Sequence, residues 1–399
     1  MKRAGARVAP HVAALPKSGI RKFFDIVAQS KDVVSLGVGE PDFDTPWHIS
    51  RAAVTCLEGG GTHYTSNLGT PALRQAIARY LARRFDAAFD WRSEILVTVG
   101  VSEAIDLAIR AICSPGDEVL YHEPCFVSYA PTIRLAHAEP VCVETRVEDG
   151  FRLTVAALER KVTPRTKAVL LNFPCNPTGA TLARDDMAAI LDFCDRHDIL
   201  VLADEVYSEL NYGEEVAADG ASGTLPSFAG FPQYRDRVVL LNGFSKSWAM
   251  TGYRLGYVCG PADIVDAMMK IHQYGIMSAP TLSQAAGVEA MDHGDKDVDR
   301  MRREYRKRRD YLVAALNALG LRTPMPQGAF YVFADIRSTG LTDVDFALRL
   351  LKEHGVACVP GSAFGACGAG FVRMSYATSL EEIRLAVKRL SDMLKSPAG

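Results

Sequence analysis

The spacing of apolar residues changes along the chain at about residue 95. Before this point, Leu73, Ile77 and Leu81 recur at helical spacing, which predicts an amphipathic helix. After it, short apolar runs alternate with amphipathic stretches, a pattern typical of a mostly parallel sheet with helices on its faces. The candidate strands are Ile95–Val99, Glu118–Tyr121, Ala168–Leu171, Ile199–Ala203, Val238–Leu241 and Leu255–Cys259.

Polar residues at the strand ends are the first candidates for chemistry, because ligands of open α/β sheets bind beyond the carboxyl ends of the strands. The run Ile199–Ala203 is continuously apolar, as in a strand buried on both faces, and Asp204 follows it directly. An isolated buried charge costs several kcal/mol, so this carboxylate needs a cationic partner. The protonated ring nitrogen of a bound ligand would provide one.

Length and composition narrow the class of protein. A chain of 399 residues with 48% hydrophobic content can bury a large core and exceeds one ordinary domain, so two lobes are expected. A net charge of −2 shows no excess of basic residues of the kind that binds nucleic acid or a membrane surface. The nine cysteines lack a CxxC pair or metal-ligand spacing, which favours reduced thiols in a cytoplasmic protein, without a disulfide and without a metal site, zinc included.

The amino-terminal segment is basic. Its first 24 residues hold six lysines and arginines and no acid, a composition that resembles a transit peptide. Pro10, His11 and Pro16 interrupt any secretory apolar core. We therefore expect an arm that lies on the body of the protein or on a partner subunit.

The stretch Gly243 to Gly256, GFSKSWAMTGYRLG, is the strongest chemical signal in the chain. Lys246 stands among small residues just after an apolar run, and Arg254 follows it eight positions on. A lysine can form a Schiff base with a carbonyl, and the commonest enzyme-bound aldehyde, pyridoxal 5'-phosphate, brings a phosphate for the arginine. The plain alternative is a surface lysine in a polar loop.

Position by position, this stretch resembles the lysine signature of class I/II aminotransferases, and the likeness extends from about Ser18 to the carboxyl terminus. The resemblance implies a fold-type I enzyme that depends on pyridoxal phosphate. Its large α/β domain would span residues 51–290 around a mostly parallel, seven-stranded sheet. Residues 1–50 would form an arm and part of a smaller α+β domain, completed by residues 291–399.

The resemblance assigns most cofactor contacts. Lys246 would carry the Schiff base and move the substrate proton, and Asp204 would keep the ring nitrogen protonated. Tyr207 and Asn176 would bind the ring oxygen, and Phe126 would stack on the ring. Asn176 belongs to an Asn-Pro-Thr-Gly turn whose Asn-Pro bond is open between cis and trans.

The phosphate site combines two kinds of group. Arg254 would join the amides of Val101 and Ser102 at a helix start, with Ser102 as a plausible N-cap. Tyr64 would reach the phosphate from the partner subunit of a homodimer with shared active sites. Some family members have a serine at the position of Gly243, and whether Ser245 compensates for it is open.

The substrate site centres on Arg373, whose side chain points away from those of its neighbours in a strand-like segment. Its planar fork suits a carboxylate, and the resemblance assigns it the α-carboxylate of the substrate, with Asn176 and the backbone of Gly39 nearby. Tyr274 and Met277 could select the substrate side chain, or pack in the core or at an interface. The basic run 300–310 is interpreted as a solvated helix face.

Three functions fit these residues. The first is an aminotransferase that moves an amino group from an α-amino acid (of aspartate, aromatic or N-acetyl-diaminopimelate type) to a 2-oxo acid such as 2-oxoglutarate. The second is a pyridoxal-phosphate C–S β-lyase, and the third is a regulatory protein that only senses the ligand. A nicotinamide-dependent enzyme is set aside, because no G-x-G-x-x-G opens a helix.

Overall fold

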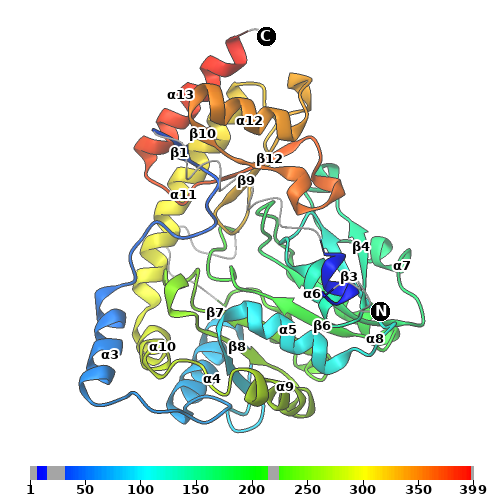
Figure 1. Ribbon diagram of the computed structural model, residues 1–399, viewed down its shortest axis with the longest axis vertical. Coiled ribbons are helices and arrows are strands. Elements are labelled where there is room, and N and C mark those ends of the chain that lie inside the picture. Colours follow the sequence, from blue (N-terminus) through cyan, green and yellow to red (C-terminus); the bar gives the residue numbers. More distant parts are fainter. Residues whose placement is uncertain (1–6, 16–31, 214–223, 397–399) are drawn as a thin grey trace, which may run out of the picture.

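The computed structural model describes residues 7–15, 32–213 and 224–396. A seven-stranded sheet forms its centre, in the order β2-β8-β7-β6-β5-β3-β4, and β8 alone runs antiparallel to its neighbours (Figure 1). The expected mostly parallel sheet is confirmed. Its strands are β2 (Ile95–Thr98), β3 (Glu118–Glu123), β4 (Glu139–Glu144), β5 (Thr166–Asn172), β6 (Leu200–Asp204), β7 (Val238–Gly243) and β8 (Gly256–Cys259).

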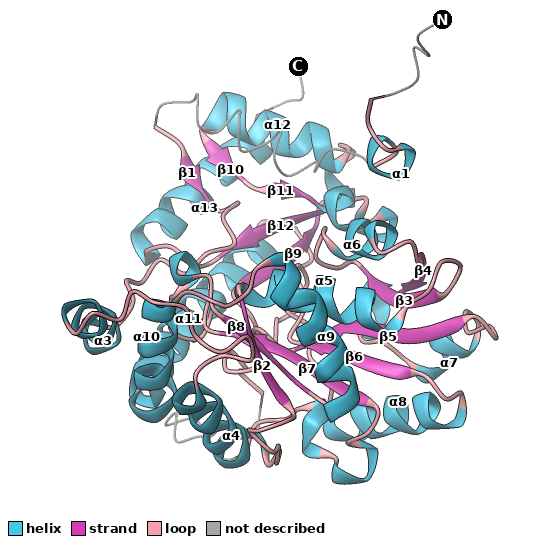
Figure 2. Ribbon diagram, turned by 60° about the horizontal axis from the view of Figure 1, so that its bottom comes forward, coloured by secondary structure: helices cyan, strands magenta, loops and turns pink. Residues whose placement is uncertain are grey.

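Helices cover both faces of this sheet (Figure 2). Side chains alternate along a strand, so Ala168 and Leu170 of β5 pack with one set of helices and Val169 and Leu171 with the other. Burial on both faces explains why the strands are continuously apolar. One face carries α5 (Gly100–Ile112), α6 (Tyr129–Leu135) and α9 (Ala262–Gly275), and the other carries α7 (Val155–Glu159) and α8 (Arg184–Arg196).

Besides the hydrophobic cores on the two faces, a third core packs against the edge of the sheet at β2. It joins α3 (Trp47–Glu58), α4 (Pro71–Phe85) and α10 (Thr281–His293) to β2 and β8. The helix expected from the spacing of apolar residues is α4. The Thr70 hydroxyl accepts a hydrogen bond from the Leu73 amide and Pro71 occupies the first turn, so the helix begins with favourable capping.

The smaller lobe has two sheets. Antiparallel β11 (Val359–Pro360), β12 (Phe371–Ser375) and β9 (Tyr331–Asp335) form one, and parallel β1 (Val34–Ser35) and β10 (Val356–Ala357) form the other. A segment near the amino terminus is therefore built into the carboxyl-terminal lobe. The helices of this lobe are α11 (Asp295–Ala318), α12 (Asp343–His354) and α13 (Leu380–Lys395).

Strand β4 was not predicted from the sequence. It contains Pro140, which cannot donate a ladder hydrogen bond and therefore weakens the strand signal. The proline is tolerated because β4 lies at the edge of the sheet, where it pairs with β3 alone.

The interpretation of residues 300–310 as a solvated face holds for Arg300, Arg303 and Lys307, which are exposed, but is wrong for three buried arginines of this run. Helix α11 crosses from the large lobe to the small one (yellow in Figure 1), and Arg302, Arg308 and Arg309 of this run are buried. Arg302 Nη2 donates to Asp299 Oδ1 at 2.5 Å, and Arg308 Nη1 donates to Asp42 at 2.8 Å. A helix that packs between two lobes can bury arginines where carboxylates or backbone carbonyls accept their hydrogen bonds.

The amino-terminal arm is described only in part. Residues Pro10–Ala13 form the short helix α1, where the His11 ring lies 4.7 Å from the ring of His137. The rest of the expected arm lies outside the described residues. Among the described helices, none combines the length and apolar character needed to cross a membrane.

Candidate active site

A cavity of about 360 Å³ opens at the carboxyl ends of β5, β6 and β7, against the small lobe. Asn172 and Asp204 end two of these strands as register partners, and Lys246 follows the third. Ten of the residues singled out from the sequence line this cavity: Gly39, Val101, Ser102, Phe126, Asn176, Asp204, Tyr207, Lys246, Arg254 and Arg373.

Lys246 lies in the connection between the antiparallel strands β7 and β8, and Ser245, Thr251 and Arg254 of the same connection also line the cavity. Its Nζ donates to the carbonyl of Gly39 at 2.7 Å. Burial lowers the pKa of Lys246 to about 8, and the positive charges of Arg373 and Arg254 act in the same direction. A sizeable fraction of the amine is therefore neutral near pH 8, the form that acts as a nucleophile or a base.

Asp204 is buried, and two hydrogen bonds hold its carboxylate while a third reaches its backbone carbonyl. Its Oδ2 accepts from the Tyr129 hydroxyl at 2.7 Å, its Oδ1 accepts from the Val206 amide at 3.2 Å, and its carbonyl accepts from Asn172 Nδ2 at 3.0 Å. Burial raises the pKa of Asp204 to about 6 despite these hydrogen bonds. The site therefore favours a cation opposite this carboxylate.

One anion position lies beside the start of α5. Arg254 lines the cavity there and forms no ion pair with any described residue. Gly100 has a φ of +74°, and an added Cβ would stand 2.9 Å from Arg254 Nη2, so only glycine lets the guanidinium come this close. The helix start has no side-chain cap, which leaves its amides free for an anion.

The expected N-cap at Ser102 was wrong. Helix α5 begins at Gly100, whose left-handed backbone turns the chain into the helix directly after β2, and the cap position is Val99. Ser102 therefore lies inside the first turn, still facing the cavity.

The place of Gly243 is crowded. A Cβ there would lie 2.9 Å from Val101 Cγ2 and 3.0 Å from the Leu255 carbonyl, which excludes a serine without a shift of neighbouring atoms. Ser245 does line the cavity. Its contact with a phosphate stays a prediction.

A second anion position surrounds Arg373, which is buried in β12. Its Nη1 donates to Asn176 Oδ1 at 2.9 Å and its Nη2 to the Gly37 carbonyl at 2.6 Å, while Nε has no partner. The guanidinium stacks on the rings of Tyr331 and Phe364, at 4.5 and 4.9 Å. Within the described part of the chain it forms no ion pair, so a buried positive charge faces the cavity uncompensated.

A chain of polar groups links this arginine to the sheet. Asn172 Oδ1 accepts from the Asn176 amide at 2.9 Å, and the Asn172 amide donates to His122 Nε2 at 3.2 Å. Burial lowers the pKa of His122 to about 4, so this ring is a neutral acceptor. The Asn176–Pro177 bond, left open by the sequence, is cis, as are Glu123–Pro124 and Phe173–Pro174.

Tyr331 and Tyr129 were not predicted from the sequence as residues of the site. The Tyr331 hydroxyl lies 2.9 Å from that of Tyr207, and a Cβ on Gly39 would stand 2.7 Å from it. Both tyrosines are fully buried in elements with ordinary apolar spacing, so no sequence signal separates them from core tyrosines such as Tyr305.

Tyr64 lies apart from the cavity, with 83% of its surface exposed. Tyr274 is 88% exposed, which rules out core packing within this chain. Tyr64 is on a loop and Tyr274 is in the last turn of α9, and the two segments are joined where Asn67 Nδ2 donates to the Met277 carbonyl at 2.8 Å. Their expected roles at a partner subunit stay predictions.

Comparison with known proteins agrees with this geometry. Residues 31–390 match the family Aminotransferase class I and II. An aspartate aminotransferase of Pyrococcus abyssi is 44% identical over 380 residues, which cover 95% of this chain and 96% of that protein. An aromatic aminotransferase structure from Pyrococcus horikoshii superposes with a TM-score of 0.87 at 43% identity, over 94% of this chain and 98% of that one.

The Thermus thermophilus aspartate aminotransferase with maleate superposes with a TM-score of 0.90 at 37% identity, over 98% of this chain and all of that one. Both the sequence match and the fold extend over nearly the whole chain. The chain therefore belongs to the class I and II aminotransferases.

Proposed function

We propose that this aminotransferase binds pyridoxal 5'-phosphate in the cavity and moves the amino group of an α-amino acid of the aspartate or aromatic type to a 2-oxo acid such as 2-oxoglutarate. One observation carries the proposal. A single cavity brings together a lysine with a lowered pKa, a buried carboxylate, and two arginines without acidic partners among the described residues.

The residues fit the cofactor at each of its ends. Arg254 and the free amides of α5 would hold its phosphate, with Ser102 and Ser245 beside them. Asp204 would pair with the ring nitrogen, which supplies the cation that this carboxylate favours. The remaining contacts are assigned to Tyr207 and Asn176 on the ring oxygen and to Phe126 on the ring face.

When bound, the cofactor supplies an electron sink for the charge that develops at the substrate Cα. The protein supplies position and proton transfer. The Lys246 amine, partly neutral because its pKa is about 8, would take the proton from the substrate Cα onto its Nζ. Asp204 provides the negative charge that holds the ring nitrogen protonated, and Tyr129 orients this carboxylate.

Arg373 would hold the substrate α-carboxylate. Asn176 and the Gly37 carbonyl already fix its plane, and the unpartnered Nε remains for the substrate. Since every amino acid and 2-oxo acid carries this carboxylate, the contact sets orientation rather than selectivity. The half-buried ring of Phe126 offers apolar area for an aromatic side chain, at roughly 25 cal/mol per Å² buried.

A screen of amino donors tests the reaction type. The purified enzyme is incubated with each amino acid, with and without 2-oxoglutarate, and glutamate, pyruvate and ammonia are measured. Glutamate formed only with the acceptor supports the proposal. Pyruvate and ammonia from a cysteine conjugate without an acceptor, as the main activity, would make the protein a β-lyase instead.

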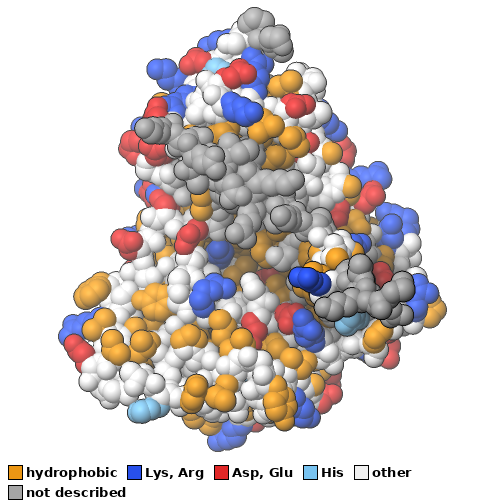
Figure 3. All heavy atoms as spheres, in the orientation of Figure 1, with side chains coloured by type: hydrophobic (Ala, Val, Ile, Leu, Met, Phe, Trp, Pro, Cys, Tyr) orange, Lys and Arg blue, Asp and Glu red, His pale blue; other side chains and the backbone are white. Residues whose placement is uncertain are grey.

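We also propose a homodimer whose active sites are shared through Tyr64. Apolar side chains gather around α3 in Figure 3, and Trp47 and Leu57 of this helix are 72% and 52% exposed. Exposed apolar residues in this number indicate a surface that another chain covers. Tyr64, Tyr274 and Met277 are also exposed, and Asn67 joins the segment of Tyr64 to Met277, just after the end of α9.

We also propose a division into two domains and a cytoplasmic location. The division into residues 1–50 with 291–399 and residues 51–290 accords with the pairing of β1 with β10 across the sequence. A cytoplasmic location accords with nine cysteines that are all free of disulfides.

A further inference from the structure

The register of β3 and β4 places two potential metal ligands on one face at the sheet edge. Tyr121 and Cys142 are register partners in this parallel pair, so their side chains share a face. Glu123 lies two residues beyond Tyr121 and shares that face. The Tyr121 hydroxyl donates to Glu123 Oε1 at 2.8 Å, which fixes the carboxylate above the strand.

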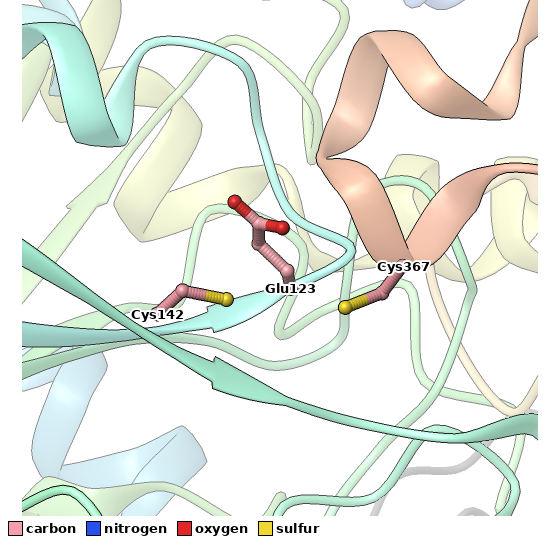
Figure 4. A group of neighbouring side chains, drawn as sticks. All are labelled: Glu123, Cys142 and Cys367. Atoms are coloured by element: carbon pink, nitrogen blue, oxygen red, sulfur yellow. The ribbon is translucent and has the colours of Figure 1, made fainter.

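The small lobe brings a third ligand to this place. Gly365 has a φ of +119°, and a Cβ there would collide with the Glu123 carboxylate, so glycine allows the approach. The next amide, of Ala366, donates to Glu123 Oε2 at 3.0 Å. Cys367 follows, and its thiol and that of Cys142 point toward one another with Glu123 between them (Figure 4). The two Sγ atoms and a Glu123 carboxylate oxygen all lie within 4.8 Å of one another.

We propose that Glu123, Cys142 and Cys367 bind one zinc ion between the two lobes. Two thiolates and a carboxylate are ligands that Zn²⁺ accepts, and a group of this size surrounds a tetrahedral ion. Binding releases the two thiol protons to solvent and changes no oxidation state. Tyr121 and the Ala366 amide supply the outer hydrogen bonds that orient a ligating carboxylate.

A fourth ligand has room beside Cys367. A second cavity, of about 370 Å³, borders this cysteine and holds the Glu144 side chain. Water or Glu144 can complete the tetrahedron from there. The three ligands are half-buried, so an ion can enter from solvent.

This site could not be recognised in the sequence, because its ligands come from positions 123, 142 and 367 and no two of them have metal-ligand spacing. The expectation of no zinc rested on that spacing alone. The fold assembles the group by joining the edge of the large sheet to the loop before β12.

The ion would cross-link the lobes close to the active site. The Cys125 amide, two residues after Glu123, donates to the Phe364 carbonyl at 3.0 Å, and Phe364 stacks on Arg373. A metal on Glu123 and Cys367 therefore fixes the small-lobe loop that covers the substrate arginine. We expect metal to raise the temperature of unfolding and to slow turnover, both reversibly with a chelator.

Cadmium and zinc binding to the full-length holoenzyme tests the proposal, under a thiol-free phosphine reductant. We expect one ion per chain and a cadmium–thiolate absorption band. Cys367→Ser and Cys142→Ser should each weaken binding by more than the roughly 10–100-fold lost with an outer-shell partner. Cys113→Ser is the matched control, since it removes another half-buried thiol outside the cluster and should leave binding unchanged.

A further variant guards against misfolding. Glu123→Gln keeps an oxygen for the Ala366 amide and should weaken zinc while the unfolding temperature of the metal-free protein stays near that of the wild type. X-ray absorption should find two sulfur ligands at about 2.3 Å. Equal binding by wild type, Cys367→Ser and Glu123→Gln would overturn the proposal.

Discussion

Replacing Asp204 by asparagine should stabilise the cofactor-free protein while it removes activity. The carboxylate is buried, and burial raises its pKa from 3.8 to about 6. The folded state thus binds the proton more tightly than the unfolded chain does. The resulting destabilisation is fully present above about pH 6, falls as the pH drops toward 3.8, and is absent below that value.

The size of the effect follows from this pKa. A change from 3.8 to about 6 corresponds to about 3 kcal/mol against the ionised folded form. Asparagine escapes this destabilisation, but its single oxygen cannot keep both the Tyr129 and Val206 hydrogen bonds, which costs about 1 kcal/mol or somewhat more. Asp204→Asn should therefore be about 1–2 kcal/mol more stable than the wild type near pH 7, and no more stable near pH 4.

Urea unfolding of both cofactor-free proteins at equal concentration measures this difference at each pH. Asp198→Asn is the control. Its side chain is 91% exposed on a backbone with a φ of 53°, which asparagine tolerates, so we expect a change within about 0.5 kcal/mol. A less stable Asp204→Asn near pH 7, or a difference that does not depend on pH, would refute the reasoning. With cofactor added, the wild type should gain more stability than the variant, and only the wild type should transaminate at a normal rate.

Four further outcomes are expected. Borohydride reduction should fix the cofactor on Lys246, and peptide mass analysis that places it on another lysine would contradict the assignment. The rate at which the cofactor binds covalently should also rise with pH through about 8, where the amine of Lys246 loses its proton. Gly100→Ala should raise the cofactor dissociation constant, because about 1–3 kcal/mol of backbone strain joins the clash with Arg254, and fluorescence titration measures it. Arg373→Lys should raise KM for amino acids and 2-oxo acids alike; a change for one substrate only would indicate a side-chain contact. Mixing inactive Tyr64→Ala and Lys246→Ala subunits should restore activity after subunit exchange, and no recovery would argue against shared sites.

The sequence was sufficient for residues whose type and position are both unusual. Lys246 among small residues, Asp204 after an apolar run and Arg373 in a buried strand could each be predicted, and the structure brings them to one cavity. The sheet was predictable for a related reason, since burial on both faces leaves a continuous apolar run.

The partners of these residues could not be predicted in the same way. Tyr129 reaches Asp204 and Tyr331 reaches Tyr207 only because distant elements pack together, and each tyrosine sits in a pattern typical of core. Arg302 and Arg308 misled for the opposite reason. A run of charges looks solvated, and only the path of α11 between two lobes shows which arginines are covered.

The antiparallel strand β8 has a consequence for how this site can vary during evolution. Because β7 and β8 pair at Gly243 and Gly256, the loop that carries Lys246 and Arg254 leaves one strand and enters the next at the same end of the sheet. An insertion or deletion in that loop would move Lys246 and Arg254 relative to each other while the sheet stayed intact. Lys246 and Arg254 therefore keep their spacing only while the loop keeps its length, whereas Arg373 belongs to β12 of the other lobe and its distance from both depends on how the two lobes pack.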